Sequence, residues 1–68
     1  MLTDKLKKFR KENHLTQEEL AEKLYVSRST VAKWEQGRGI PDRANLSELS
    51  KFMGIEEDEL LEEDEAIN

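Results

Sequence analysis

Apolar side chains recur every three or four residues through most of this chain, with polar side chains between them. Leu2, Leu6 and Phe9 follow this spacing, which predicts an amphipathic helix that ends near residues 13–14. Thr3 is a candidate N-cap for this first helix, because its hydroxyl can accept a hydrogen bond from a free backbone N–H.

A second helix is predicted to begin after Thr16. Thr16 and Glu19 have the spacing of a capping box, in which each side chain accepts a hydrogen bond from the other residue's backbone N–H. Leu15 and Leu20 flank the cap as a hydrophobic staple. The face predicted to be buried consists of Leu20, Ala21 and Leu24.

The same start signals recur at Ser27, which predicts a third helix. Ser27 is a good N-cap residue, and Val26 and Val31 have the staple spacing around it. Val31 and Trp34 are expected to face inward, and Gly37 is expected to end the helix in a left-handed conformation. Two short helices joined by a tight turn form a unit that presents one helix to an external partner.

The remaining apolar residues predict two more helices. The two glycines and the proline within residues 37–41 indicate a loop, and Asp42 is a suitable N-cap for a fourth helix that ends at Gly54. A short fifth helix is expected before Leu61. The predicted fold class is all-α: a bundle of about five short helices over residues 1–61, followed by an acidic, frayed tail at 62–68. The expected apolar positions of the last two helices are Leu46, Leu49, Phe52, Met53, Ile55, Leu60 and Leu61.

Composition narrows the possible classes of protein. With 68 residues and no cysteine, the chain is one small domain without disulfides or thiolate metal ligands. His14 is the one histidine, so a helix-end role is expected rather than metal binding. No set of residues is spaced for nucleophilic catalysis, and no apolar run could cross a membrane. We therefore expect no enzyme activity, no cofactor, no small-molecule pocket and a cytoplasmic location.

The charge is unevenly distributed along the chain. The formal net charge is −5, but all 11 Lys and Arg residues lie at or before Lys51, and eight of the 16 acidic residues follow Ile55. Residues 1–55 thus carry a net charge of +3 and residues 56–68 a net charge of −8. The negative net charge of the whole chain therefore does not argue against nucleic-acid binding by residues 1–55. Three roles stay open for the acidic end: a solvated tail, a linker to a missing domain, or an electrostatic competitor of DNA.

The predicted third helix has a polar outer face that suits the DNA major groove. Its first turn holds Arg28 and Ser29, and Arg28 can donate two hydrogen bonds to a guanine. No carboxylate precedes Glu35 in this helix, although 16 of the 68 residues are acidic. Glu35 is expected to project sideways and pair with Arg10 of the first helix. Gln17 is placed beside the free N–H groups of the second helix, which suit a phosphate.

The stretch TQEELAEKLYVSRSTVAKWEQG, residues 16–37, resembles the Cro/CI-type (xenobiotic-response-element, lambda-repressor-like) helix-turn-helix family. The resemblance extends from Leu6 to Leu61, and it implies a five-helix bundle that binds double-stranded DNA as a homodimer on inverted half-sites. One departure is Tyr25, in a turn position where such motifs often have glycine. The resemblance implies base contacts from Arg28, Ser29 and Lys33 with support from Thr30, and backbone contacts from Gln17, Ser27, Gln36, Arg38 and Arg43.

The sequence thus predicts a DNA-binding transcriptional regulator, with a repressor that occupies promoter DNA as the first hypothesis. The alternative is a protein-interaction module, such as an antitoxin or an adaptor that uses the same fold to bind a protein. The outer face of residues 28–36 distinguishes the two, because a protein-binding face would expose apolar side chains. Only Ala32 is apolar among its outward positions, which favours DNA.

Overall fold

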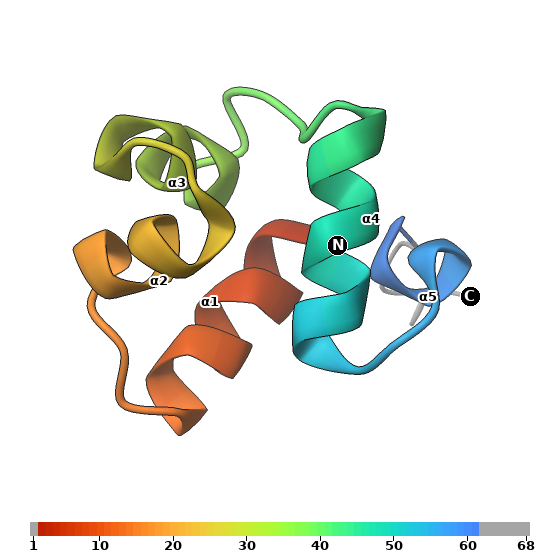
Figure 1. Ribbon diagram of the computed structural model, residues 1–68, viewed down its shortest axis with the longest axis horizontal. Coiled ribbons are helices and arrows are strands. Elements are labelled where there is room, and N and C mark those ends of the chain that lie inside the picture. The colour runs from red at the N-terminus through yellow and green to blue at the C-terminus, as the bar shows by residue number, and fades with distance from the viewer. Residues whose placement is uncertain (1, 62–68) are drawn as a thin grey trace.

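A computed structural model describes residues 2–61, and within that range all regular structure is helical (Figure 1). The predicted tail at 62–68 lies outside the described residues. The all-α class and the number of helices predicted from the sequence are confirmed. The five helices are α1 (Leu2–Glu12), α2 (Gln17–Leu24), α3 (Arg28–Glu35), α4 (Arg43–Met53) and α5 (Glu57–Leu61).

Three helices begin at the caps that the sequence predicts. The Glu19 N–H donates to Thr16 Oγ1 at 3.0 Å and the Thr16 N–H donates to Glu19 Oε1 at 2.8 Å, which completes the capping box. Ser27 caps α3, where the Thr30 N–H donates to Ser27 Oγ at 3.2 Å. Asp42 caps α4 in the same way. These local signals therefore set where the helices start.

The expected role of Thr3 is wrong. Helix α1 already includes Thr3, so its side chain lies on the helix instead of capping it. The hydroxyl donates to the Trp34 carbonyl oxygen at 3.1 Å, which links the start of α1 to the last turn of α3. That carbonyl belongs to the last turn of α3 and also accepts from the Gly37 N–H at 3.3 Å, so Thr3 gives a helix-end carbonyl a second donor.

Four helices end with a residue in the left-handed conformation. His14 and Tyr25 follow α1 and α2 with φ of 56° and 60°, and Gly37 and Gly54 follow α3 and α4 with φ of 72° and 73°. The next residue's N–H closes each end by donating to a carbonyl five residues earlier, as in a Schellman motif. The donors are Leu15, Val26, Arg38 and Ile55, at distances of 3.0, 3.0, 2.9 and 3.1 Å.

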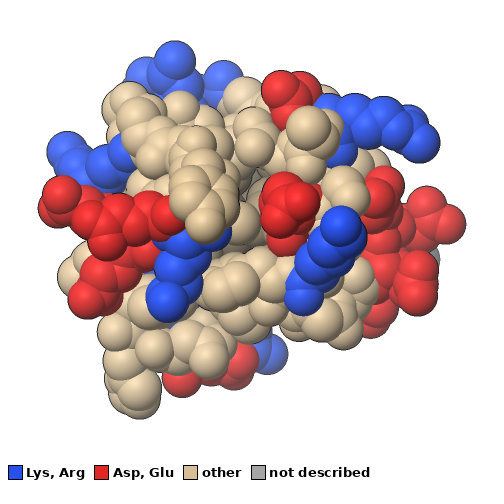
Figure 2. All heavy atoms as spheres, viewed as in Figure 1, with Lys and Arg blue, Asp and Glu red and all other residues tan. Residues whose placement is uncertain are grey.

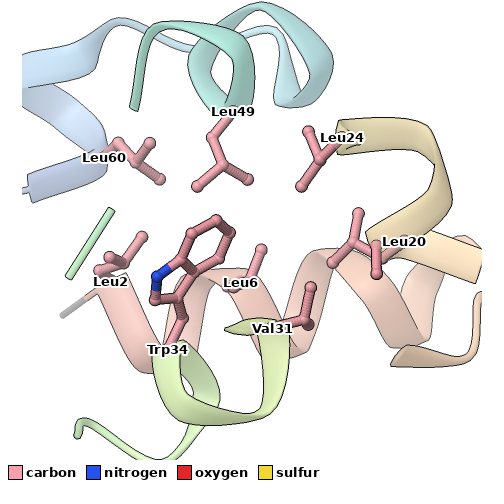
Figure 3. Close-up of a cluster of buried hydrophobic side chains, with 9 residues drawn as sticks. Leu2, Leu6, Leu20, Leu24, Val31, Trp34, Leu49 and Leu60 are labelled. Carbon is pink, nitrogen blue, oxygen red and sulfur yellow. The ribbon is translucent and has the colours of Figure 1, made fainter. Parts of the chain in front are cut away.

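All five helices contribute to a single core (Figure 3). Helix α1 lies between two pairs of helices, with α2 and α3 on one side and α4 and α5 on the other (Figure 1). Phe52 and Leu61 are exceptions to the predicted pattern, because they are 36% and 48% exposed, whereas Leu60 is fully buried. The buried apolar residues are Leu2, Leu6, Leu20, Ala21, Leu24, Val31, Trp34, Leu49 and Leu60.

Candidate nucleic-acid interface

Helix α3 is anchored by one face and presents the other to solvent. Val31 and Trp34 are buried against the neighbouring helices, as the sequence predicts. The side chains predicted to contact bases lie on the remaining face, where Arg28, Ser29 and Lys33 are exposed and Thr30 is half-buried. Burial of the inner face therefore fixes which side chains α3 offers to a partner.

The hydroxyl groups at the start of α3 contact one another. Ser27 Oγ lies 3.1 Å from Ser29 Oγ and 2.9 Å from Thr30 Oγ1. Because Ser27 Oγ also accepts from the Thr30 N–H, this cluster holds the first turn of the helix together. The arrangement suits a supporting role for Thr30, whose hydroxyl is directed to Ser27.

Exposed polar and cationic side chains continue this surface into the loop after α3. Gln36 caps the end of the helix, Arg38 follows it, and Arg43 opens α4; all three residues are exposed. In the view of Figure 2, basic side chains lie at the edge formed by α3 and the start of α4, with an acidic group between them, and others lie over the middle of the molecule; acidic side chains gather over α5 and over α2. Arg28, Lys33, Arg38 and Arg43 thus lie on α3, in the loop after it or at the start of α4.

The one carboxylate of α3 is turned into the protein. Glu35 Oε2 accepts from Arg10 Nε at 2.6 Å, and Glu35 Oε1 accepts from Arg10 Nη2 at 3.0 Å. The Glu35 side chain is 4% exposed and that of Arg10 is 15% exposed. Arg10 Nη1 also donates to the Leu15 carbonyl oxygen at 2.9 Å, so the pair ties α1 both to α3 and to the turn before α2.

Burial alone would raise the pKa of Glu35, because a carboxylate is costly to remove from water. The hydrogen bonds from Arg10 and Gln17 and the positive charges of Arg10 and Lys7 outweigh that effect, so the pKa of Glu35 is below its ordinary value. The hydrogen bond with Glu35 raises the pKa of Arg10 in turn. Both groups are therefore charged at neutral pH.

Gln17 makes two side-chain contacts that sequence reasoning did not foresee. Its Nε2 donates to Glu35 Oε1 at 3.1 Å, and its Oε1 accepts from Arg28 Nη1 at 3.3 Å. The predicted contact of Gln17 with a phosphate stays a prediction, and its second amide hydrogen is available for one. No sequence signal indicates the link to Glu35, because the two residues are 18 positions apart and meet only when α2 and α3 pack.

Metal-ion clusters and membrane-spanning helices are not found in the described part of the chain. Between Leu2 and Leu61 no group of histidine, aspartate and glutamate side chains is placed to hold a metal ion. None of the described helices has the length and apolar character needed to cross a membrane. The exposed polar face of α3 and the loop that follows it therefore form the candidate interface.

Comparison with known proteins gives a family model, described as helix-turn-helix, that matches residues 6–60. The chain is 48% identical over 64 residues to the HTH-type transcriptional activator BcrR of Enterococcus faecalis, covering 94% of this chain but 31% of that protein. It is 40% identical to an uncharacterized HTH-type transcriptional regulator of Methanocaldococcus jannaschii, covering 94% of this chain and 98% of that protein. It is 32% identical to the cryptic phage CTXphi transcriptional repressor RstR of Vibrio cholerae, of which it spans 59%.

A solved structure has the same fold. The SOS-response transcriptional repressor LexA from Eubacterium rectale superposes with a TM-score of 0.85, over 98% of this chain and 71% of that one. The sequence identity is 24%, so this likeness concerns the arrangement of the helices alone.

Proposed function

The chain belongs to the helix-turn-helix family of transcriptional regulators and is not an enzyme, and from this premise we propose that it binds a specific double-stranded DNA sequence through the outer face of α3. Arg28, Ser29 and Lys33 contact base edges in the major groove, and Thr30 supports them. The backbone contacts proposed for this surface come from Gln17, Ser27, Gln36, Arg38 and Arg43.

The observation that carries this proposal is the burial of Glu35. Helix α3 contains no other carboxylate, so its exposed face carries only cationic and uncharged polar groups together with the small side chain of Ala32. DNA presents a dense row of phosphates, and a carboxylate on this face would repel it. The pairing of Glu35 with Arg10 thus leaves α3 free of exposed negative charge.

The same surface argues against the protein-interaction alternative. The large apolar side chains that are exposed in the described residues are Tyr25, Ile40, Phe52 and Leu61; none of them belongs to α3, and Ile40 lies in the loop after it. A face that binds a protein is expected to have an apolar centre. The outer face of α3 lacks one, which favours DNA.

We further propose that the protein acts in the cytoplasm as a repressor that occupies promoter DNA as a homodimer. One domain of this size makes few contacts, so useful specificity calls for two copies on inverted half-sites about one helical turn apart. Among the relatives, the name of RstR includes a repressor and that of BcrR an activator. Repression is proposed because bound DNA alone is sufficient for it.

Selection from a random DNA pool at near-physiological salt tests this function. Enrichment of an inverted repeat is the expected result and gives the operator directly. Enrichment of one short half-site would support sequence-specific binding but overturn the homodimer. If the folded protein enriches nothing, the DNA-binding proposal is wrong and the protein-partner alternative replaces it.

Arg28→Ala then tests the base contact. The substitution is expected to cost about 1–3 kcal/mol on the selected site and to relax one base position. Arg38→Ala is the matched control, because loss of a phosphate contact weakens binding to selected and random DNA alike. Equal losses on both kinds of DNA for Arg28→Ala would assign Arg28 to the backbone.

A further inference from the structure

Four polar side chains form a continuous path from the packing of α1 against α3 to the outer face of α3. Arg10 and Gln17 both donate to Glu35 Oε1, at 3.0 Å and 3.1 Å. Gln17 Oε1 in turn accepts from Arg28 Nη1 at 3.3 Å. The path thus starts at a carboxylate that is 4% exposed and ends at an exposed guanidinium that is proposed to contact a base.

The buried carboxylate determines which way the Gln17 amide points. An ionised carboxylate has only acceptors, so the amide must direct its NH2 group inward to Glu35. Its oxygen then faces outward, where it attracts a hydrogen-bond donor. Arg28 has donors only, which makes it a suitable partner for an amide held in this orientation.

Resting on the proposed function, we infer that Glu35 is a positioning residue for DNA recognition: through the Gln17 amide it orients the Arg28 guanidinium before DNA is bound. One nitrogen, Nη1, contacts Gln17, and the other guanidinium N–H groups stay available for the two acceptors of a guanine. A side chain that is ordered in advance loses less conformational entropy on binding. The effect is specific to the correct base, because a freely rotating arginine adapts to other acceptors.

Two variants interrupt the path at different points. Gln17→Met removes the amide and leaves the Arg10–Glu35 pair intact. The double variant Arg10→Met and Glu35→Met removes the carboxylate without leaving an unpaired buried charge, and such replacements are often tolerated. Gln36→Met is the matched control, because it removes an exposed amide of the same interface that lies outside the path.

The DNA measurement is the discrimination ratio, which is the dissociation constant for the site with the base at Arg28 replaced divided by that for the selected site. This ratio is expected to fall roughly two- to tenfold in both variants, the effect of freeing one long side chain. The double variant should change the affinity for random DNA by less than about twofold, whereas Gln17→Met also removes a proposed backbone contact and should weaken binding to all DNA by a common factor that cancels in the ratio. In an Arg28→Ala background, Gln17→Met should not change the ratio further. The control is expected to weaken selected and random DNA alike.

A second measurement needs no DNA. The NMR order parameter of the Arg28 Nε–Hε group in the free protein should be lower in both variants than in the unchanged chain. In the unchanged chain, one side-chain amide hydrogen of Gln17 should also exchange more slowly than those of Gln36. That comparison keeps the link to Glu35 testable if the double variant does not fold.

Four results would overturn the inference: an unchanged order parameter, equal exchange rates for Gln17 and Gln36, an unchanged discrimination ratio, or the same loss of ratio without Arg28. If the unchanged chain selects no DNA sequence, the proposed function itself fails. The recognition role of Glu35 then fails with it, and the order parameter and the exchange rates show separately whether Glu35 orders Arg28 in the free protein.

Discussion

Two ion pairs, one between α1 and α3 and the other within α4, differ in distance and in exposure. Arg10 and Glu35 join α1 to α3 with a 2.6 Å contact between side chains that are 15% and 4% exposed. Lys51 and Glu48 lie within α4, 4.0 Å apart, with side chains that are 73% and 59% exposed. An exposed pair of this kind contributes little to stability, whereas breaking a buried pair leaves a charge without a partner.

The difference shows how each half of the bundle is held. Helix α3 is linked to α1 through Arg10 and through the hydroxyl of Thr3, and both contacts require particular atoms to face each other. Helices α4 and α5 contribute mainly apolar side chains, such as Leu49 and Leu60, together with one hydrogen bond from Lys5 Nζ to the Glu59 carbonyl oxygen. Hydrogen bonds are directional and apolar contacts are not. The helix that presents the candidate interface is therefore held in orientation as well as in place.

Breaking the buried pair is expected to have the largest effect. Glu35→Ala leaves the Arg10 guanidinium partly buried without its carboxylate, which should lower the free energy of unfolding by about 3–5 kcal/mol. Urea unfolding followed by circular dichroism measures this loss, and in so small a domain the variant can be largely unfolded at 25 °C.

Glu48→Ala is the matched control in the other half. It removes the carboxylate of the exposed pair, so its effect should stay within about 0.5 kcal/mol. A loss below about 1 kcal/mol for Glu35→Ala, or equal losses for the two variants, would remove the distinction between the pairs.

Local features of this fold were predictable from the sequence, and long-range ones only partly. The caps at Thr16, Ser27 and Asp42 depend on residues three apart, so the sequence displays them directly. The pair of Arg10 and Glu35 was also foreseen, since a carboxylate at the side of α3 needs a cation on the adjoining helix.

What the sequence did not predict depends on how helices meet. The contact of Thr3 with the Trp34 carbonyl and the contact of Gln17 with Glu35 join residues 31 and 18 positions apart. Periodicity shows which face of a helix is buried but not how far that helix is shifted along its neighbour. The candidate base-contacting residues follow from the face of α3 alone, and their predicted roles await the DNA measurements.

The apolar packing of α5 is tested by truncating Leu60, its fully buried side chain. Leu60 is fully buried among side chains of the core, so Leu60→Ala should cost about 2–4 kcal/mol through lost burial and the cavity that remains. Leu61→Ala, at the 48% exposed neighbour, should cost less than about 1 kcal/mol. Equal destabilisation of the two variants in urea would show that α5 does not bury Leu60 as described.

Acid should weaken the buried pair before it removes the apolar contacts. The hydrogen bonds and positive charges around Glu35 outweigh the effect of burial and lower its pKa, so its contribution to stability is fully present above the pKa of an unfolded glutamate, about 4.3. That contribution is lost as the pH falls through the lower pKa of the folded state.

Glu35→Gln isolates this effect, because it removes the Glu35 charge and leaves every other carboxylate in place. The advantage of the unchanged chain over Glu35→Gln in free energy of unfolding should be constant between about pH 6 and 7 and should shrink as the pH falls below about 4.3. Urea titrations at each pH measure it. An advantage that grows on acidification would mean that the pKa of Glu35 is raised instead of lowered.

The smallest expected effects concern the left-handed residues at the ends of α2 and α4. Gly54 has a φ of 73°, and a Cβ there would meet no heavy atom within 4 Å. Gly54→Ala should therefore cost about 1 kcal/mol from backbone conformation alone.

Tyr25 has a φ of 60° and is 93% exposed, so Tyr25→Gly should remove the same strain and lose little packing. Because glycine also gains freedom in the unfolded chain, the net stabilisation should be about 0.5 kcal/mol. Opposite shifts of the urea midpoint in the two variants are the expected result, and destabilisation by Tyr25→Gly would show that the tyrosine ring makes a stabilising contact in the turn.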